Sequence, residues 1–383
     1  MSRFGIVVIG YNRVNSIDRL LSSLNSAYYD EDVDLIISID NSGTDCVENY
    51  ANQFSWKFGK KIVRTFESRL GLRKHVLTCG NYLNEYGFEA VIVLEDDICV
   101  SPAFFSYSKK AAEFYAESDF VAGISLYTHH WNANADRPFY PIQTNYDAFF
   151  MQYPQSWGQV WLKKQWNDFY SWYRNGDYKN LNSAKVPSDV LAWPETSWLK
   201  YHIQYCIDQN KYFVYPYTSL STNFADQGTH YKYSTNKMQV SLLMGDTYDY
   251  KFPNSMSDAS VYDAYFENSK MSYLLNVPEE ELCVDLYGKK RNLESRYILN
   301  TISMPYKVVK SFGLQMRPWD MNVVYGVPGN DIYLYDTFEA ATIVRNKHRS
   351  LTQWAYDTRG IVLLKRNFMD IIAHEIFNKI RVK

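Results

Sequence analysis

Several features that would assign a function directly are scarce in this sequence or missing from it. The 383 residues contain 40 Lys and Arg against 42 Asp and Glu, a formal net charge of −2, so no basic field points to nucleic acid as a partner. No apolar run reaches the roughly 18 residues typical of a transmembrane helix. Met1-Ser2-Arg3 precedes only a short apolar run, Ile6 to Ile9, so the sequence also predicts no signal peptide.

Cysteine is sparse, and its spacing excludes the common metal and disulfide frameworks. No CxxC or zinc-type spacing occurs among the five cysteines, which are Cys46, Cys79, Cys99, Cys206 and Cys283. Scattered cysteines of this kind are typical of reduced thiols, and we therefore expect a cytoplasmic protein.

The familiar glycine-rich nucleotide loops are missing as well. The first apolar run is followed by Gly10-Tyr11-Asn12-Arg13, which is not the G-x-G-x-x-G of a dinucleotide fold, and no P-loop is present. The G-x-G-T-rich loop of sugar nucleotidyltransferases is not found either. Aromatic residues, by contrast, are abundant: 34 Tyr, 21 Phe and 10 Trp make 17% of the chain. Such residues suit cores, interfaces and sugar faces alike.

The N-terminal part alternates short apolar runs with helix-like segments. Strands are predicted at residues 4–9, 33–39, 61–66 and 91–94, with helices at 17–24, 46–54 and from 71 to about 86 between them. This alternation predicts an α/β fold with a mostly parallel sheet flanked by helices. The composition changes near residue 246, so we expect a C-terminal α+β accessory region over 246–383.

The most informative stretch is the apolar run 90–94, which leads straight into Glu95-Asp96-Asp97. A short run of this kind is typical of a strand buried on both faces, and ligands of such sheets bind beyond the carboxyl ends of the strands. Three adjacent carboxylates repel one another, and Mg²⁺ or Mn²⁺ bridging to phosphates would offset that repulsion. The structural alternative is an acidic loop or a helix N-terminus.

The ends of the other predicted strands add polar residues to the same edge of the sheet. Asn12 and Arg13 follow the first strand, and Asp40 follows the second. Because the carboxyl ends of parallel strands lie at one edge, a nucleotide is expected there.

These residues resemble the GT-A glycosyltransferases, and most closely glycosyltransferase family 2 and the N-acetylglucosaminyltransferase I type. The resemblance spans about residues 4–231 and rests on Asp40 and on Val93-Leu94-Glu95-Asp96-Asp97 followed by Ser101-Pro102-Ala103-Phe104-Phe105, with Trp157-Gly158 and Glu195 later in the chain. It implies a GT-A domain over 1–245. It also implies transfer of a sugar from a nucleotide donor, most simply UDP-linked, to a glycan or lipid-linked acceptor in bacterial surface-polysaccharide synthesis.

The resemblance also implies roles for individual residues. Asp97 would hold the divalent cation together with His230, Asp40 would accept a hydrogen bond from the uracil N3–H, and Arg13 would lie near the diphosphate, where a guanidinium suits phosphate oxygens. The remaining donor-binding residues would be Asn12, Arg69, Arg73, Glu95, Asp96, Trp157 and Gly158. Each has a structural alternative, such as a turn cap for Asp40, a surface ion pair for Arg73, an ordinary loop residue for His230 and a core residue for Trp157.

An inverting mechanism needs a carboxylate that deprotonates the acceptor hydroxyl, with a pKa raised toward the working pH by partial burial. Glu195 is the first candidate, at the start of a helix predicted from Trp193 to about Gln209, and Asp226 is the second. The structural alternative for Glu195 is a first-turn acid that favours the helix dipole. A retaining transferase, a sugar nucleotidyltransferase and a catalytically silent carbohydrate-binding relative stay open as alternative functions.

The C-terminal segment 361–383 has one apolar helical face and basic residues at its ends. That pattern fits a helix lying on a membrane surface, where lipid-linked acceptors would be found, and equally a helix that docks on its own domain or on a second subunit of a homo-oligomer.

Overall fold

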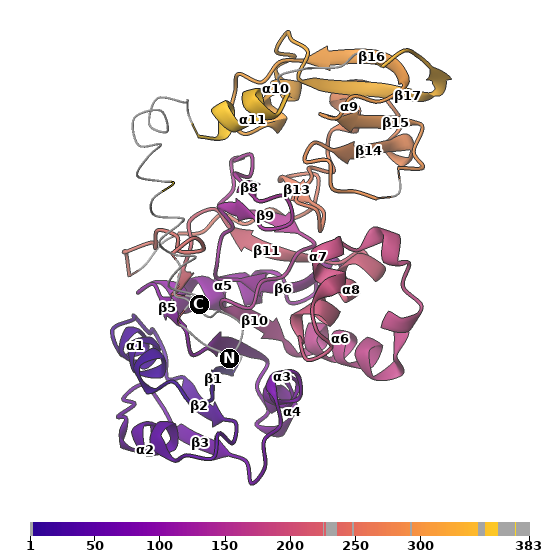
Figure 1. Cartoon of the computed structure of the whole chain (residues 1–383). Helices are drawn as coiled ribbons and strands as arrows, with labels where there is room; N and C mark the ends of the chain where they lie inside the picture. The colour runs from indigo at the N-terminus through magenta and orange to yellow at the C-terminus, as the bar shows by residue number, and fades with distance from the viewer. Residues whose placement is uncertain are drawn as a thin grey trace. The chain divides into compact units, whose positions relative to one another are not determined.

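The structure is a computed structural model, and it describes residues 3–224, 226, 236–246, 249–291, 293–343, 349–358 and 372. The chain divides into two compact units (Figure 1). The first contains residues up to Lys270 together with a short segment from Lys289, and the second contains Met271–Gly288 and the residues from Leu293 onward. Residues 249–270, which the sequence assigned to the C-terminal region, therefore lie in the first unit.

A nine-stranded sheet forms the centre of the first unit. Across the sheet the strands are β13 (Val261–Tyr262), β9 (Ala148–Met151), β11 (Tyr212–Pro216), β6 (Val121–Ser125), β10 (Gln159–Leu162), β4 (Ala90–Glu95), β1 (Phe4–Gly10), β2 (Asp34–Ile39) and β3 (Lys61–Thr65). β4, β1, β2 and β3 are mutually parallel, and β10 runs antiparallel between β4 and β6. The predicted α/β class with a mostly parallel sheet is confirmed.

Helices cover both faces of this sheet, as the sequence predicted (Figure 1). Ile6 and Val8 of β1 share one core with apolar residues of α1, α2 and α5, whereas Gly80 at the end of α3 lies against the Trp166 ring of α6 on the other face. The helices are α1 (Val14–Asn25), α2 (Cys46–Gln53), α3 (Leu72–Gly80), α4 (Tyr82–Glu85), α5 (Phe104–Phe114), α6 (Lys163–Asn175), η1 (Asp177–Lys179), η2 (Ser183–Lys185), α7 (Ser188–Ala192) and α8 (Leu199–Asp208).

Two small ribbons complete the first unit, and one of them directly follows the acidic residues 95–97 in the chain. β5 (Ile98–Val100) pairs antiparallel with β12 (Ser221–Asn223), and β7 (Trp131–Asn132) pairs with β8 (Arg137–Pro138). Residues 221–223 have no apolar side chain, yet they form this strand. The pairing with β5 makes this segment a strand, which the local sequence pattern does not indicate.

The second unit has its own four-stranded sheet, in the order β14 (Leu282–Asp285), β15 (Tyr297–Asn300), β17 (Ile332–Ala340) and β16 (Tyr306–Phe312). Its helices are α9 (Ser272–Leu275), η3 (Glu279–Glu281), α10 (Asp320–Val324) and α11 (Arg349–Asp357). A separate apolar core that includes Leu299, Trp319 and Leu334 holds them together.

The basic amphipathic segment predicted at 361–383 lies outside the described residues, apart from Ile372. Among the helices that the structure describes, none combines the length and apolar character needed to cross a bilayer.

Candidate functional site

The acidic residues occupy the point where the strand order of the sheet reverses. β1 is followed on one side by β2 and β3, and the chain then returns to place β4 on the other side of β1. Gly10 is level with Ile39, and Ile9 is level with Glu95, so the carboxyl ends of β1, β2 and β4 coincide. Crevices at such reversals are the usual ligand sites of open α/β sheets.

Glu95 ends β4, and Asp96 and Asp97 form the turn that leads into β5. The Phe224 amide donates to the Asp97 carbonyl at 2.9 Å, and the Ser101 amide donates to the Leu220 carbonyl at 2.8 Å. The segment around β12 therefore holds both ends of β5, the strand that leaves the acidic turn.

Arg13, which lies between β1 and α1 and immediately precedes α1, ion-pairs with two of the three acids. Its Nη2 binds the Asp96 carboxylate, its Nε donates to Asp96 Oδ2 at 3.3 Å, and its Nη1 reaches Asp97 Oδ2 at 3.4 Å. Burial raises the pKa of Asp96 to about 6, although the Arg13 guanidinium acts in the opposite direction. The guanidinium thus offsets part of the repulsion among the acids. Asn12 beside it is exposed.

Asp97 keeps one oxygen free. Its Oδ1 is buried and has no hydrogen-bond partner among the described residues. An uncompensated buried oxygen is costly, and carboxylate oxygens are the ligands that Mg²⁺ and Mn²⁺ prefer, often with only one or two carboxylates and the oxygens of a bound phosphate. Asp97 therefore fits the predicted cation. Within the part of the chain that the structure describes, no three His, Cys, Asp or Glu side chains gather into a metal site. His230, the other predicted ligand, lies outside the described residues.

Glu95 connects the acidic turn to α8. Its two oxygens accept from Trp198 Nε1 and from Ser156 Oγ, each at 3.3 Å. Burial and the neighbouring Asp97 raise the pKa of Glu95 well above its ordinary range, against the hydrogen bond from Trp198. Glu95 is thus a positioning residue that favours its protonated form.

Glu95→Gln should stabilise the protein at high pH. Because the folded-state pKa is raised, the folded protein binds more protons than the unfolded chain between the two pKa values, so stability falls as pH rises through that window. Gln carries no such ionisation penalty. We therefore expect a gain of about 1–3 kcal/mol in the free energy of unfolding at about pH 9, and little gain at about pH 5. Urea unfolding at the two pH values measures this. If the variant and the wild type differed in unfolding free energy by the same amount at both pH values, the raised pKa of Glu95 would be contradicted.

Asp40, at the carboxyl end of β2, binds the chain between β3 and α3. It is buried, and its oxygens accept from the amides of Asn41 at 2.9 Å, Leu70 at 2.7 Å and Gly71 at 2.9 Å. Gly71 has a φ of 78°, a left-handed conformation that favours glycine. Arg69, two residues earlier, is exposed and stacks over the Tyr11 ring at 5.0 Å. Asp40 thus anchors the loop that brings Arg69 next to β1.

Asp40→Ala should therefore affect stability as well as nucleotide affinity. Hydrogen bonds to a charged acceptor contribute about 1.5–3 kcal/mol each, so we expect a loss of at least about 2 kcal/mol in the free energy of unfolding. If Asp40 also receives the uracil N3–H, UDP affinity falls by about 10- to 150-fold. Denaturant unfolding and calorimetric titration with UDP separate the two effects. A destabilised variant with wild-type UDP affinity would restrict Asp40 to holding the loop.

Glu195 lies in a turn before α8 rather than in the first turn of a helix, because α8 begins at Leu199 and not near Trp193. Its side chain is 72% exposed, where partial burial was expected. The Tyr201 hydroxyl and Lys200 Nζ both donate to it, the latter at 3.0 Å, and they lower the pKa of Glu195. Arg73 of α3 donates to the same Tyr201 hydroxyl at 2.8 Å.

Asp226, the second predicted base, lies beside α1. Ser16 Oγ donates to it at 2.7 Å, and Arg19 forms an ion pair with it while stacking over the Phe224 ring at 3.9 Å. Burial pulls the pKa of Asp226 upward, but the hydrogen bonds from Arg19 and Ser16 outweigh it and lower the pKa. Phe224, two residues before Asp226, donates to the Asp97 carbonyl, so Asp226 lies near the acidic turn.

Gly158 is a tight backbone position beside Trp157. Its φ is 99°, and a Cβ there would lie 3.1 Å from Leu126 and 3.2 Å from Ser221 Oγ. Trp157 is half-buried and packs edge-on against Tyr127 at 4.8 Å. The contacts of both residues belong to the packing between β6, β10 and β12, and their predicted part in donor binding stays a prediction.

Four residues of this region were not predicted as site residues from the sequence: Ser16, Arg19, Trp198 and Tyr201. Ser16 and Arg19 are three positions apart on α1, so their shared helix face was available as a signal. Trp198 and Tyr201 meet Glu95 and Arg73 only through tertiary packing, and the sequence gives no local signal for those contacts.

Comparison with known proteins adds little to this geometry. No protein-family model and no curated protein matches the sequence. Among solved structures, S. aureus TarS 1–349 is similar with a TM-score of 0.35 and 15% identity, over 57% of this chain and 59% of that chain. The same protein in complex with UDP-GlcNAc gives a TM-score of 0.35 and 15% identity, over 57% of each chain. The chain thus spans less than two thirds of these structures, and a likeness at this level describes neither its activity nor its substrates.

Proposed function

We propose that this protein is a metal-dependent glycosyltransferase that transfers a sugar from a nucleotide-diphosphate donor, most simply a UDP-sugar, to a glycan or lipid-linked acceptor. The observation that carries the proposal is the acidic turn at the strand-order reversal, with one unpartnered oxygen on Asp97. This buried carboxylate cluster has an open ligand position and lies beside Arg13 and Asp40 on the neighbouring strand ends. It suits a donor that has a charged diphosphate and a nucleotide base.

In this proposal Asp97 and His230 hold the cation, which when bound neutralises the charge that develops on the departing diphosphate. Arg13 binds a diphosphate oxygen, and in doing so exchanges a carboxylate of the acidic turn for a phosphate group as its anionic partner. Asp96 and Glu95 orient the turn. Asp40 positions the uracil ring of the donor, either through its own oxygen or through the loop at Gly71. Arg69 and Arg73 flank this loop, so that their guanidinium groups add positive charge on the donor side.

The acceptor reacts by inversion in this proposal. The acceptor hydroxyl loses its proton to a carboxylate while its oxygen forms a bond to the anomeric carbon and the bond from that carbon to the diphosphate oxygen breaks. Glu195 is our first candidate for the base, and Asp226 is the second. Both have lowered pKa values, so both are ionised at neutral pH, but neither has the raised pKa that was expected of the base, and each is a weaker proton acceptor for it. For a lipid-linked acceptor in surface-polysaccharide synthesis, segment 361–383 would supply a peripheral membrane contact.

Calorimetric titration with UDP, with and without Mn²⁺, tests the proposal directly. We expect UDP affinity to depend on Mn²⁺ and a screen of nucleotide-sugars to reveal slow hydrolysis of one donor. A catalytically silent carbohydrate-binding relative would bind sugar without metal-linked affinity for UDP. A sugar nucleotidyltransferase would instead release pyrophosphate from a nucleoside triphosphate and a sugar phosphate, and a retaining transferase would differ in the anomeric configuration of its product.

A further inference from the structure

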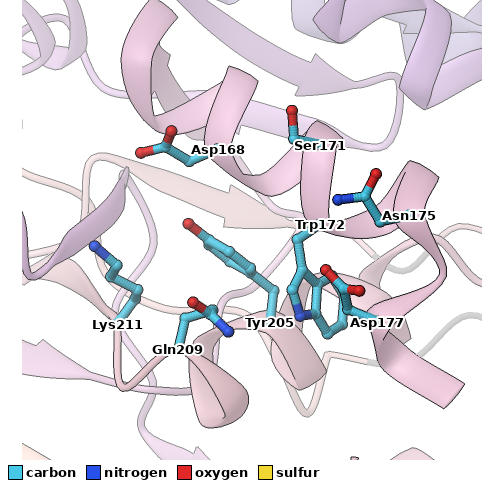
Figure 2. Close-up of a pocket in the computed structure, with 8 residues that line it drawn as sticks. All are labelled: Asp168, Ser171, Trp172, Asn175, Asp177, Tyr205, Gln209 and Lys211. Carbon is cyan, nitrogen blue, oxygen red and sulfur yellow. The ribbon is translucent and has the colours of Figure 1, made fainter. Parts of the chain in front are cut away.

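A pocket of about 290 Å³ lies between α6, η1 and α8, away from the acidic turn (Figure 2). Two of the residues that line it, Gln209 and Lys211, immediately precede β11. β11 is parallel to β6, and both are parallel to β4 because β10 runs antiparallel between β6 and β4. The start of β11 therefore lies at the opposite edge of the sheet from the carboxyl end of β4. The pocket is a separate site from the one described above.

Two aromatic rings form the apolar wall of this pocket. Trp172 of α6 and Tyr205 of α8 are both buried and meet at 5.6 Å with an angle of 63° between their planes. The indole Nε1 of Trp172 donates to Asp208 Oδ2 at 2.8 Å, which fixes the ring. Figure 2 shows the two rings side by side, with the Tyr205 hydroxyl directed toward Asp168. Because both rings are buried, only small parts of them reach the pocket, enough for C–H groups of a small ring to contact but not for a whole ring face to stack on.

Polar groups available to a ligand line the α6 side of the pocket. Asp168, Ser171 and Asn175 are exposed and stand three and four residues apart, so they share one stripe of the helix. Their side chains form no hydrogen bond with any other residue that the structure describes. Figure 2 shows them along the same helix. The pocket thus offers a carboxylate, a hydroxyl and an amide on one side.

The charges of the pocket favour neutral or cationic ligands. Asp168 and Asp177 contribute two carboxylates, whereas Lys211 is the one cationic side chain in the lining, and its Nζ already donates to the Asp119 carbonyl. A phosphate or carboxylate ligand would meet net negative charge here. Hydroxyl or ammonium groups of a ligand would find hydrogen-bond acceptors in the carboxylates of Asp168 and Asp177.

We propose that this pocket binds one hexose or hexosamine unit of a glycan, as a second saccharide site away from the acidic turn. A pyranose combines C–H groups with hydroxyl donors around its edge, which matches a small apolar wall beside a carboxylate, a hydroxyl and an amide. The volume lies at the lower end of the range for ligand pockets, so it suits a single small ring. The proposal goes beyond the proposed transfer reaction and does not depend on it.

The test uses three probes that share one ring and differ in charge: glucose, glucosamine and glucuronate. Saturation-transfer NMR on the full chain, with excess UDP present, should detect glucose and glucosamine, with glucosamine bound more tightly and glucuronate at least about tenfold more weakly than glucosamine. Asn175→Ala should weaken glucose binding by about fivefold. Asp168→Asn should remove most of the preference for glucosamine over glucuronate. Asn180→Ala, an equally exposed position outside the lining, should bind as wild type.

The proposal is overturned if no probe shows saturation transfer, if Asn175→Ala and Asp168→Asn both bind as wild type, or if the sugar binds only in samples from which UDP is left out. Displacement by UDP would place the sugar at the acidic turn instead. Both variants change exposed side chains, so loss of folding is not expected, and thermal unfolding checks it. UDP titration of the same samples tests the transferase proposal separately, so failure of one proposal is visible without failure of the other.

Discussion

Asp97→Asn is expected to lower the rate of sugar transfer by at least about 10³-fold, since metal-assisted stabilisation of a leaving group contributes several kcal/mol. The variant keeps the shape of the side chain but replaces the anionic oxygens. Because Oδ1 has no partner among the described residues, and Oδ2 contacts Arg13 only at 3.4 Å, the fold should lose little. Initial-rate assays with saturating donor and Mn²⁺ measure the effect, and thermal unfolding confirms that the fold is intact.

Asp32→Asn is the matched control, because Asp32 is an exposed aspartate in the loop between α1 and β2. It should show wild-type rates. Titration with Mn²⁺ and UDP gives a second readout: Asp97→Asn should abolish the part of the UDP affinity that depends on Mn²⁺. Near wild-type turnover in Asp97→Asn would remove this residue from the metal site and would leave its free oxygen to an ordered water molecule.

Glu195→Gln is expected to lower kcat by about 10²–10⁴-fold, the usual contribution of a general base, with little change in donor affinity. Gln preserves the shape and can still accept from Tyr201 and Lys200, but it cannot take a proton. Since the pKa of Glu195 is lowered, the wild-type kcat should stay level on the acidic side down to below the ordinary glutamate value of 4.5. A pH profile of kcat checks this together with the variant.

Asp226→Asn in the same assay decides between the two candidate bases. It breaks the contact with Arg19 and weakens the one with Ser16, so its stability and UDP affinity must be measured beside its kcat. A large loss of kcat in Asp226→Asn alone would transfer the role of base to Asp226. Wild-type kcat in both variants would contradict an inverting mechanism with a protein base, and NMR of the anomeric configuration of the product would then decide between inversion and retention.

The first four strands and the helices between them could be predicted from sequence because each is a local pattern. β1, β2, β3 and β4 lie within one residue of their predicted bounds at every end, since each is a short apolar run. The helix predicted from 71 to about 86 is divided at Asn81 into α3 and α4, where Asn81 accepts from the Trp166 indole at 3.3 Å. That contact comes from a residue 85 positions later, so no local pattern shows it.

The position of the candidate site could be predicted from the sequence, but the contacts between its side chains could not. Glu95, Asp96 and Asp97 follow a strand, and the topology rule alone places them beside Arg13 and Asp40. The rule does not say that Arg13 binds two of these acids, or that Asp40 binds the loop at Gly71. Those contacts depend on backbone directions after each strand. Glu195 shows the same limit, because its exposure follows from where α8 begins, and Pro194 only indicates that a turn lies nearby.

The pairing of β5 with β12 has a consequence for the order in which the protein forms during synthesis. The strand that leaves the acidic turn finds its partner at Ser221–Asn223, more than a hundred residues later in the chain. A nascent chain can complete β1 to β4 as soon as they emerge, because their contacts are relatively local. The strand pairing that anchors the end of the turn forms only after β12 has been made, and contacts of such long sequence separation form slowly. The acidic turn should therefore be among the last parts of the first unit to become ordered.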